Sequence, residues 1–123
     1  MSSLRPRVLL VDDDARILSA FERLLSPCCE VVGRVTDVSA LFDEATRLQP
    51  DVIVVDFFMP ARDGLETCRR LKVVIPQARI VVVSGADDAS TRSKALHAGA
   101  SAFVSKMQAA DDLVPAIQEA AAT

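Results

Sequence analysis

Polar residues capable of chemistry directly follow four short apolar segments of this sequence. They are Asp12, Asp13, Asp14, Asp56, Ser84 and Lys106. Two carboxylates about 4 Å apart repel each other by about 4 kcal/mol at an effective dielectric constant of 20, so a cluster of them needs a positive partner. Lys106 supplies one positive charge, and Mg²⁺, which prefers one or two carboxylates plus waters, would supply two. Such a site suits phosphoryl transfer, in which a carboxylate can be the nucleophile.

Five strand–helix units are predicted to position these residues. Short apolar runs predict strands at 8–11, 30–35, 52–55, 80–84 and 102–105. Helical spacing of apolar residues predicts helices at 15–25, 38–48, 65–74, 89–99 and 110–121. Pro115 either kinks the last helix or stands in its first turn. The runs 8–11, 52–55 and 80–83 have no polar alternation, which indicates a parallel sheet covered by helices on both faces.

The parallel sheet explains why an apolar strand should end in a carboxylate. All carboxyl ends of parallel strands lie at one edge, where ligands bind. We therefore expect Asp12, Asp13, Asp56, Ser84 and Lys106 to share a pocket. The alternative for a lone Asp after a strand is a helix N-cap or a solvated loop position, and Asp14 suits the cap of the first helix.

Composition narrows the class of protein. A length of 123 residues, half of them apolar, fits one domain. With 14 Lys plus Arg against 17 Asp plus Glu, the chain has no basic excess for nucleic acid. No apolar run approaches the about 20 residues of a membrane helix, and the N-terminus lacks a signal-peptide pattern. We therefore expect a cytoplasmic protein.

The cysteines and the histidine do not suggest a further site. Cys28, Cys29 and Cys68 are odd in number and have no accompanying C-x-x-C or histidine cluster, which argues against a disulfide framework or a zinc site. Reduced thiols are the expected state. His97 stands near a predicted helix end, where a solvated or capping role is favoured.

Four blocks of sequence, in this order and at these separations, resemble the receiver domain of bacterial two-component response regulators. They are VLLVDDD, DVIVVDFFMPARDG, VVVSGADD and ALHAGASAFVSK. The resemblance runs from Arg7 to about Ala120 and implies one receiver domain over residues 1–123, with the flavodoxin-like (βα)5 fold and strand order 2-1-3-4-5. The C-terminal half resembles the NarL/LuxR-like group, which usually continues into a helix-turn-helix DNA-binding domain that these residues do not include.

The resemblance implies roles for the acidic residues. Asp56 corresponds to the phosphoacceptor, and Asp13 corresponds to the direct ligand of Mg²⁺. Asp12 corresponds to the partner acid of Asp13, often acting through water. Phe58 corresponds to the position whose backbone carbonyl also binds the metal. The expected metal site is therefore Asp12, Asp13, Asp56 and the carbonyl of Phe58.

Further roles concern the phosphoryl group and its signal. Ser84 corresponds to the hydroxyl that bonds a phosphoryl oxygen, Lys106 to the lysine that pairs with phosphate, and Phe103 to the aromatic ring whose rotamer follows phosphorylation. Phosphate bound to Ser84 would draw the fourth strand towards Asp56, which lets Phe103 enter from the surface. Met107 follows Lys106 where receivers often have proline, so we expect no cis peptide there.

The implied function is a phosphoacceptor switch and not an enzyme acting on other substrates. A sensor histidine kinase would donate phosphate to Asp56 in a Mg²⁺-dependent step, and the domain would catalyse only its own phosphorylation and dephosphorylation. The expected readout is the face formed by the fourth helix, fifth strand and fifth helix, with phosphorylation-dependent homodimers. No membrane contact and no direct binding of nucleic acid are expected of this domain.

Three alternatives are weighed against this interpretation. A dehalogenase-type phosphatase needs a second Asp two positions after its nucleophile, where this chain has Phe58. A flavodoxin needs a phosphate loop after the first strand, but DDDAR would repel the phosphate of FMN. A pseudo-receiver, which binds partners without being phosphorylated, usually lacks a site residue, and here all are present. It remains the alternative from a different functional class.

Overall fold

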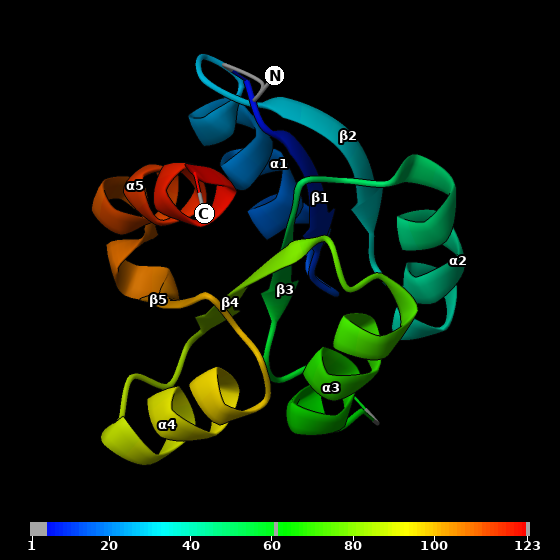
Figure 1. Ribbon diagram of the computed structural model, residues 1–123. Helices are drawn as coiled ribbons and strands as arrows, with labels where there is room; N and C mark the ends of the chain where they lie inside the picture. The colour runs from blue at the N-terminus through cyan, green and yellow to red at the C-terminus, as the bar shows by residue number, and fades with distance from the viewer. Residues whose placement is uncertain (1–4, 61, 123) are drawn as a thin grey trace.

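The computed structural model of the protein describes residues 5–60 and 62–122, along which strands and helices alternate (Figure 1). The strands are β1 (Arg7–Val11), β2 (Glu30–Val35), β3 (Val52–Asp56), β4 (Arg79–Ser84) and β5 (Ala102–Ser105). The helices are α1 (Ala15–Leu25), α2 (Val38–Leu48), α3 (Gly64–Val74), α4 (Ala89–His97) and α5 (Ala109–Ala122), with a 3-10 turn, Lys106–Gln108, before α5.

The strands form one parallel sheet in the order β2-β1-β3-β4-β5, which confirms the predicted fold. The central strand β3 is buried along its whole length, as its continuous apolar run requires. Its last residue is Asp56, so the strand carries a carboxylate to the carboxyl edge of the sheet.

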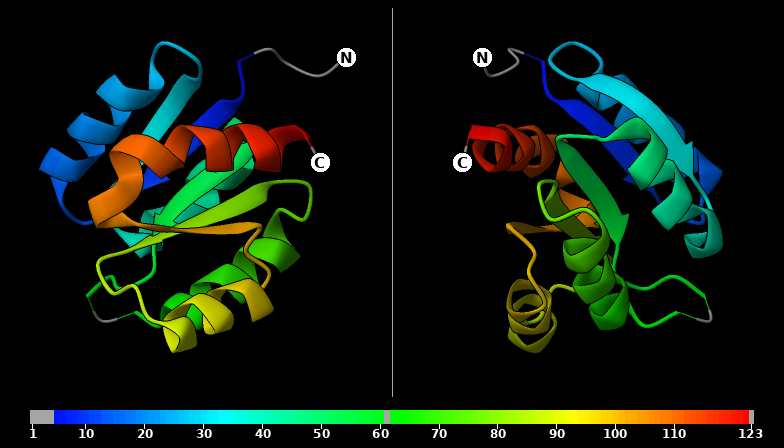
Figure 2. Two further views of the ribbon diagram at one scale, coloured as in Figure 1. Left: turned by 90° about the vertical axis from the view of Figure 1, so that its left-hand side faces the viewer. Right: turned by 45° about the vertical axis from the view of Figure 1, so that its right-hand side comes forward.

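Helices cover both faces of the sheet, as Figure 2 shows. On one face α1 and α5 bury large apolar side chains such as Leu18, Leu25 and Ile117 against the strands. On the other face α2 and α3 bury Leu41 and Leu71. The helix α4 lies on that second face but is anchored by small residues, and its buried positions are Thr91 and Ala95.

Local signals explain where the helices begin and end. Asp14, Asp37, Asp63 and Asp88 each cap a helix by accepting a backbone N–H, which confirms the predicted cap role of Asp14. The helix α4 ends earlier than predicted, at His97, because Gly99 has a positive φ of 112° that a helix cannot continue. Pro115 lies inside α5 well past the first turn, so the alternative that placed it in the first turn is wrong.

Candidate functional site

The carboxyl edge of the sheet brings three carboxylates together. Oxygen atoms of Asp12, Asp13 and Asp56 all lie within 4.8 Å of one another, although two of these residues follow β1 and the third ends β3. Asp12 and Asp56 are buried, whereas Asp13 is exposed. The neighbouring Asp14 does not join this cluster, because its carboxylate accepts the backbone N–H of Arg16 at 2.9 Å.

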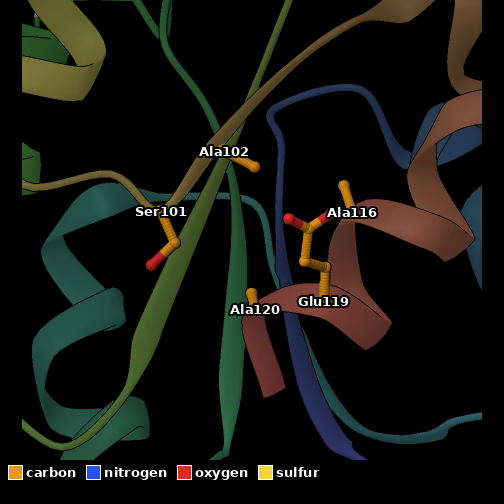
Figure 3. Close-up of a pocket in the computed structure, with 5 residues that line it drawn as sticks. All are labelled: Ser101, Ala102, Ala116, Glu119 and Ala120. Carbon is orange, nitrogen blue, oxygen red and sulfur yellow. The ribbon is translucent and has the colours of Figure 1, made fainter. Parts of the chain in front are cut away.

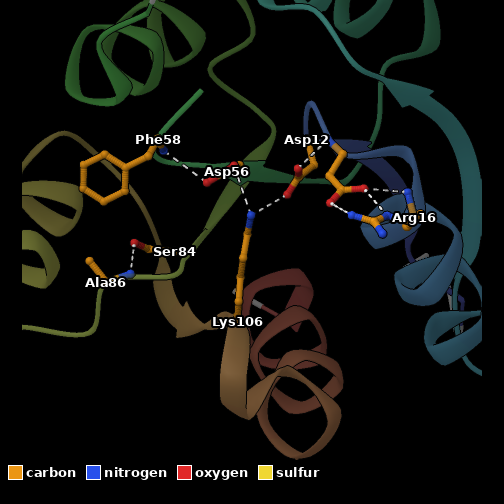
Figure 4. Close-up of polar contacts among 8 residues, drawn as sticks. Asp12, Arg16, Asp56, Phe58, Ser84, Ala86 and Lys106 are labelled. Atoms are coloured by element: carbon orange, nitrogen blue, oxygen red, sulfur yellow. Dashed lines mark hydrogen bonds and ion pairs between the residues drawn. The ribbon is translucent and has the colours of Figure 1, made fainter. Parts of the chain in front are cut away.

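Lys106 supplies the positive charge that this cluster needs. Its Nζ lies 2.9 Å from Oδ2 of Asp12 and 3.1 Å from Oδ2 of Asp56, as Figure 4 shows. Burial by itself would lower the pKa of Lys106, but the two carboxylates together raise it above its ordinary value. The lysine therefore stays charged and bridges residues that are brought to it by β1 and β3.

Asp56 is held in place although its charge is disfavoured. Its Oδ1 accepts the backbone N–H of Phe58 at 3.1 Å, and its Oδ2 accepts from Lys106. Burial raises the pKa of Asp56 in spite of these two interactions. The side chain of Phe58 is 55% exposed and extends away from the carboxylates in Figure 4, so this residue contributes backbone to the site.

The cluster fits a hard divalent cation. Within the described residues, these three aspartates form the only group of three or more potential metal ligands. Oδ2 of Asp12 is buried and, apart from its ion pair with Lys106, has no aligned hydrogen-bond donor among residues 5–60 and 62–122. Mg²⁺ binds carboxylate oxygens while it keeps several waters as ligands. One carboxylate of this cluster, that of Asp13, belongs to an exposed residue.

Ser84 is the last residue of β4, and Phe103 is the second residue of β5. Ser84 is fully buried, and its hydroxyl accepts the backbone N–H of Ala86 at 3.0 Å. A hydroxyl that accepts one hydrogen bond can still donate its own hydrogen to another acceptor. The ring of Phe103 is 7% exposed, so it already occupies the inward position that the switching hypothesis assigns to the phosphorylated state.

A contact that the sequence did not reveal covers this ring. The guanidinium carbon of Arg92, on α4, lies 4.8 Å from the ring centroid of Phe103, on β5. The same guanidinium forms an ion pair with Asp87 at 3.2 Å, in the loop between β4 and α4. No sequence pattern signals this contact, because it depends on how α4 packs against β5.

A cavity elsewhere in the fold has no comparable chemistry. It measures about 180 Å³ and lies between the start of β5 and the second half of α5 (Figure 3). Its lining residues are Ser101, Ala102, Ala116, Glu119 and Ala120. One carboxylate among small side chains gives no group of residues for catalysis or metal binding, so the carboxylate cluster remains the candidate site.

Comparison with known protein families identifies the kind of domain. The family profile described as response regulator receiver domain matches residues 8–118. The chain belongs to this family. The receiver fold matches the observed strand order and helix arrangement. Among the residues that the structure describes, no helix has the length and apolarity to cross a membrane.

Curated relatives and solved structures agree with this assignment. Response regulator MprA of Mycobacterium leprae (strain TN) is 34% identical over 112 residues, covering 91% of this chain and 49% of the relative. The nitrate/nitrite response regulator protein NarL of Escherichia coli (strain K12) is 34% identical, covering 99% of this chain and 58% of the relative. The chain thus spans about half the length of these curated relatives.

Two solved structures show the same fold over nearly the whole chain. A LuxR-family two-component response regulator from Aurantimonas sp. SI85-9A1 has a TM-score of 0.90 at 29% identity, covering 96% of this chain and 86% of that one. The response regulator domain of Thermotoga maritima CheB has a TM-score of 0.86 at 29% identity, covering 97% of this chain and 98% of that one.

Proposed function

We propose that Asp56 accepts a phosphoryl group from the phosphohistidine of a sensor kinase. The observation that carries this proposal is the placement of Asp56 within 4.8 Å of two further carboxylates and 3.1 Å from Lys106. A carboxylate oxygen of Asp56 forms the new bond to phosphorus while the phosphorus–nitrogen bond breaks. The freed imidazole nitrogen takes up a proton, and the product is an acyl phosphate.

The neighbouring residues would support this transfer electrostatically. Asp12 and Asp13, with Asp56 and the backbone carbonyl of Phe58, would hold Mg²⁺, which neutralises charge on the phosphoryl oxygens when it is bound. Lys106 is already paired with Asp56 and would follow the new negative charge. With every one of these residues present, a pseudo-receiver that binds partners without phosphorylation is not favoured.

The output of the switch belongs to the same proposal. A phosphoryl group on Asp56 offers strong acceptor oxygens to the hydroxyl of Ser84, at the end of β4. Movement there would reach α4, which few large side chains anchor, and then Phe103 through Arg92. We propose that the face formed by α4, β5 and α5 then favours homodimers, as part of a NarL/LuxR-like regulator of transcription.

Acetyl phosphate tests the proposed phosphorylation without a kinase. Intact mass after incubation with acetyl phosphate and Mg²⁺ should show one added phosphate. The matched variant Asp56→Asn and a sample with chelator should show none. A comparable yield in either control would refute the assignment.

Beryllofluoride tests the output separately from the chemistry. Light-scattering mass should rise towards that of a dimer when beryllofluoride and Mg²⁺ are added, and Ser84→Ala should remain a monomer. If the unaltered protein stays monomeric although it takes up phosphate, phosphorylation stands and the dimer proposal fails.

A further inference from the structure

Two adjacent thiols lie at the opposite edge of the sheet from the carboxylate cluster. Cys28 and Cys29 connect α1 to β2, in the loop beside the start of β1 (Figure 1), and their Sγ atoms are 3.7 Å apart. Cys28 is partly exposed, whereas Cys29 is 1% exposed and packs in the core cluster beneath α1. Neither residue is part of the proposed phosphorylation site.

The loop holds this pair in a fixed arrangement. The guanidinium of Arg5 donates to the carbonyl of Ser26 at 3.1 Å and to that of Cys29 at 2.9 Å. The backbone N–H groups of Cys28 and Cys29 both donate to the carbonyl of Leu25, at 3.0 and 2.8 Å. These hydrogen bonds fix the backbone on both sides of the pair. The entropy cost of ordering the loop on ligand binding should therefore be small.

The spacing disfavours a disulfide and suits a bridging atom. Peptide bonds in the described residues are trans, which puts the Cα atoms of neighbouring residues about 3.8 Å apart. Disulfides need Cα atoms about 4.4–6.8 Å apart, so a direct Cys28–Cys29 bond would be strained. The two Sγ atoms are 3.7 Å apart, so one atom bonded to both sulfurs would need only a small closing movement of the two side chains.

The number of thiols available here indicates which kind of atom the pair could bind. Structural Zn²⁺ takes four protein ligands, but no group of three or more potential ligands includes this pair in the part of the chain that the structure describes. Zinc also requires thiolates, and burial raises the pKa of the Cys29 thiol to about 12. A trivalent arsenic atom that already bears one carbon needs two thiols and no other ligand.

We propose that Cys28 and Cys29 form a dithiol site for monosubstituted trivalent arsenicals. In the reaction of R–As(OH)₂ with the pair, two As–S bonds form and two As–O bonds break. The thiol protons leave with the two hydroxyl groups as two water molecules, and arsenic stays trivalent. The first bond forms at the partly exposed Cys28. The second, to Cys29, is then intramolecular and benefits from a high effective concentration.

Phenylarsine oxide is the probe for this site. The reduced full chain should take up one phenylarsenic group by intact mass, and an excess of monothiol should leave it bound while ethanedithiol removes it. Cys28→Ser and Cys29→Ala should each lower the apparent affinity by about a hundredfold, because each leaves a monothiol. Cys68→Ala removes a buried thiol that packs on the other face of the sheet from the pair, so that variant should bind as the unaltered protein does.

Several outcomes would overturn the proposal. Unchanged affinity in Cys28→Ser, loss of binding in Cys68→Ala, or no adduct under conditions that modify a small dithiol would each do so. Cys28 is partly exposed, so its variant decides the matter even if replacement of buried Cys29 prevents folding. Tighter binding of Zn²⁺ than of phenylarsine oxide, lost in Cys28→Ser, would contradict the choice of ligand.

Discussion

The two edges of the sheet are built for different purposes. At the carboxyl edge, buried Asp12 and Asp56 face Lys106, and fully buried Ser84 stands at the end of the next strand. At the amino edge, backbone groups bond to one another, as the N–H of Asp51 does to the carbonyl of Arg7 at 2.9 Å. The fold therefore buries charged side chains at the carboxyl edge, whereas a charged residue of the amino edge such as Asp51 is exposed.

The charged edge opposes folding in the absence of a cation. Buried charges lose hydration, and attraction between them only partly offsets that loss. Burial raises the pKa of Asp56, which means that the folded protein disfavours its ionised form. Variants at the carboxyl edge should therefore lose phosphorylation or Mg²⁺ binding without losing stability. Variants near the amino edge should lose stability and keep both activities.

The largest expected effect lies near the amino edge. Leu25, at the end of α1, is fully buried, so Leu25→Ala should lower the free energy of unfolding by about 2–5 kcal/mol. Denaturant titration measures this loss. The variant should still accept phosphate from acetyl phosphate at a temperature where it is folded. Val73→Ala, at a position 80% exposed, is the matched control and should change stability by less than about 0.5 kcal/mol.

Removal of one charge from the cluster should affect metal binding next. Asp13→Asn should weaken Mg²⁺ binding by at least about tenfold in calorimetric titration, since Asp13 is an exposed member of the cluster. In chelator its melting temperature should equal or exceed that of the unaltered protein. Asp14→Asn removes an adjacent charge outside the cluster and keeps a capping side chain. Equal Mg²⁺ affinity in both variants would exclude Asp13 as a ligand.

The stability of the metal-free protein should depend on Asp56 and pH. A carboxyl with a raised pKa destabilises the fold above that pKa, so Asp56→Asn should raise the melting temperature in chelator at neutral pH. This increase in melting temperature should shrink as the pH falls through the raised pKa of folded Asp56 towards 3.8, its pKa in the unfolded chain. Below that pH the carboxyl is protonated in both the folded and the unfolded protein. A gain that grows towards acid pH would contradict this account.

The smallest effect concerns the cover of Phe103. Arg92→Ala should weaken beryllofluoride binding by about two- to fivefold, because a cation–π contact of about 0.5–1 kcal/mol that favours the inward ring is lost. Titration of beryllofluoride in the presence of Mg²⁺ measures this shift. Arg69→Ala, at an exposed position on α3, provides the control. Unchanged affinity in Arg92→Ala would mean that the inward ring is not the activated position.

The sequence predicted the elements with the strongest periodicity. The continuous apolar runs placed β1, β3 and β4 to within a residue of their observed bounds, because strands buried on both faces leave no other pattern. Parallel strands share a carboxyl edge, so the cluster of Asp12, Asp56 and Lys106 also followed from order along the chain. The predicted helix 89–99 extends two residues past the observed end of α4 at His97, because it includes Gly99, whose positive φ stops the helix.

Contacts that depend on tertiary packing could not be predicted. The position of Arg92 over Phe103 joins a helix to a strand and depends on the rotamers of both side chains. The contact of the Phe58 ring with the ring of Phe57, whose centroid lies 5.3 Å away, likewise depends on side-chain rotamers. Sequence patterns report which residues reach an edge of the sheet, but not how side chains pack once they are there.

Locating the phosphoryl group on the chain tests the role of Asp56 directly. Borohydride reduces an acyl phosphate of aspartate to homoserine, so a phosphorylated chain can be reduced, digested and sequenced by mass spectrometry. We expect homoserine at position 56 in samples treated with acetyl phosphate and Mg²⁺, and none when chelator is present. Homoserine at position 12 or 13, with Asp56 intact, would refute Asp56 as the phosphoacceptor.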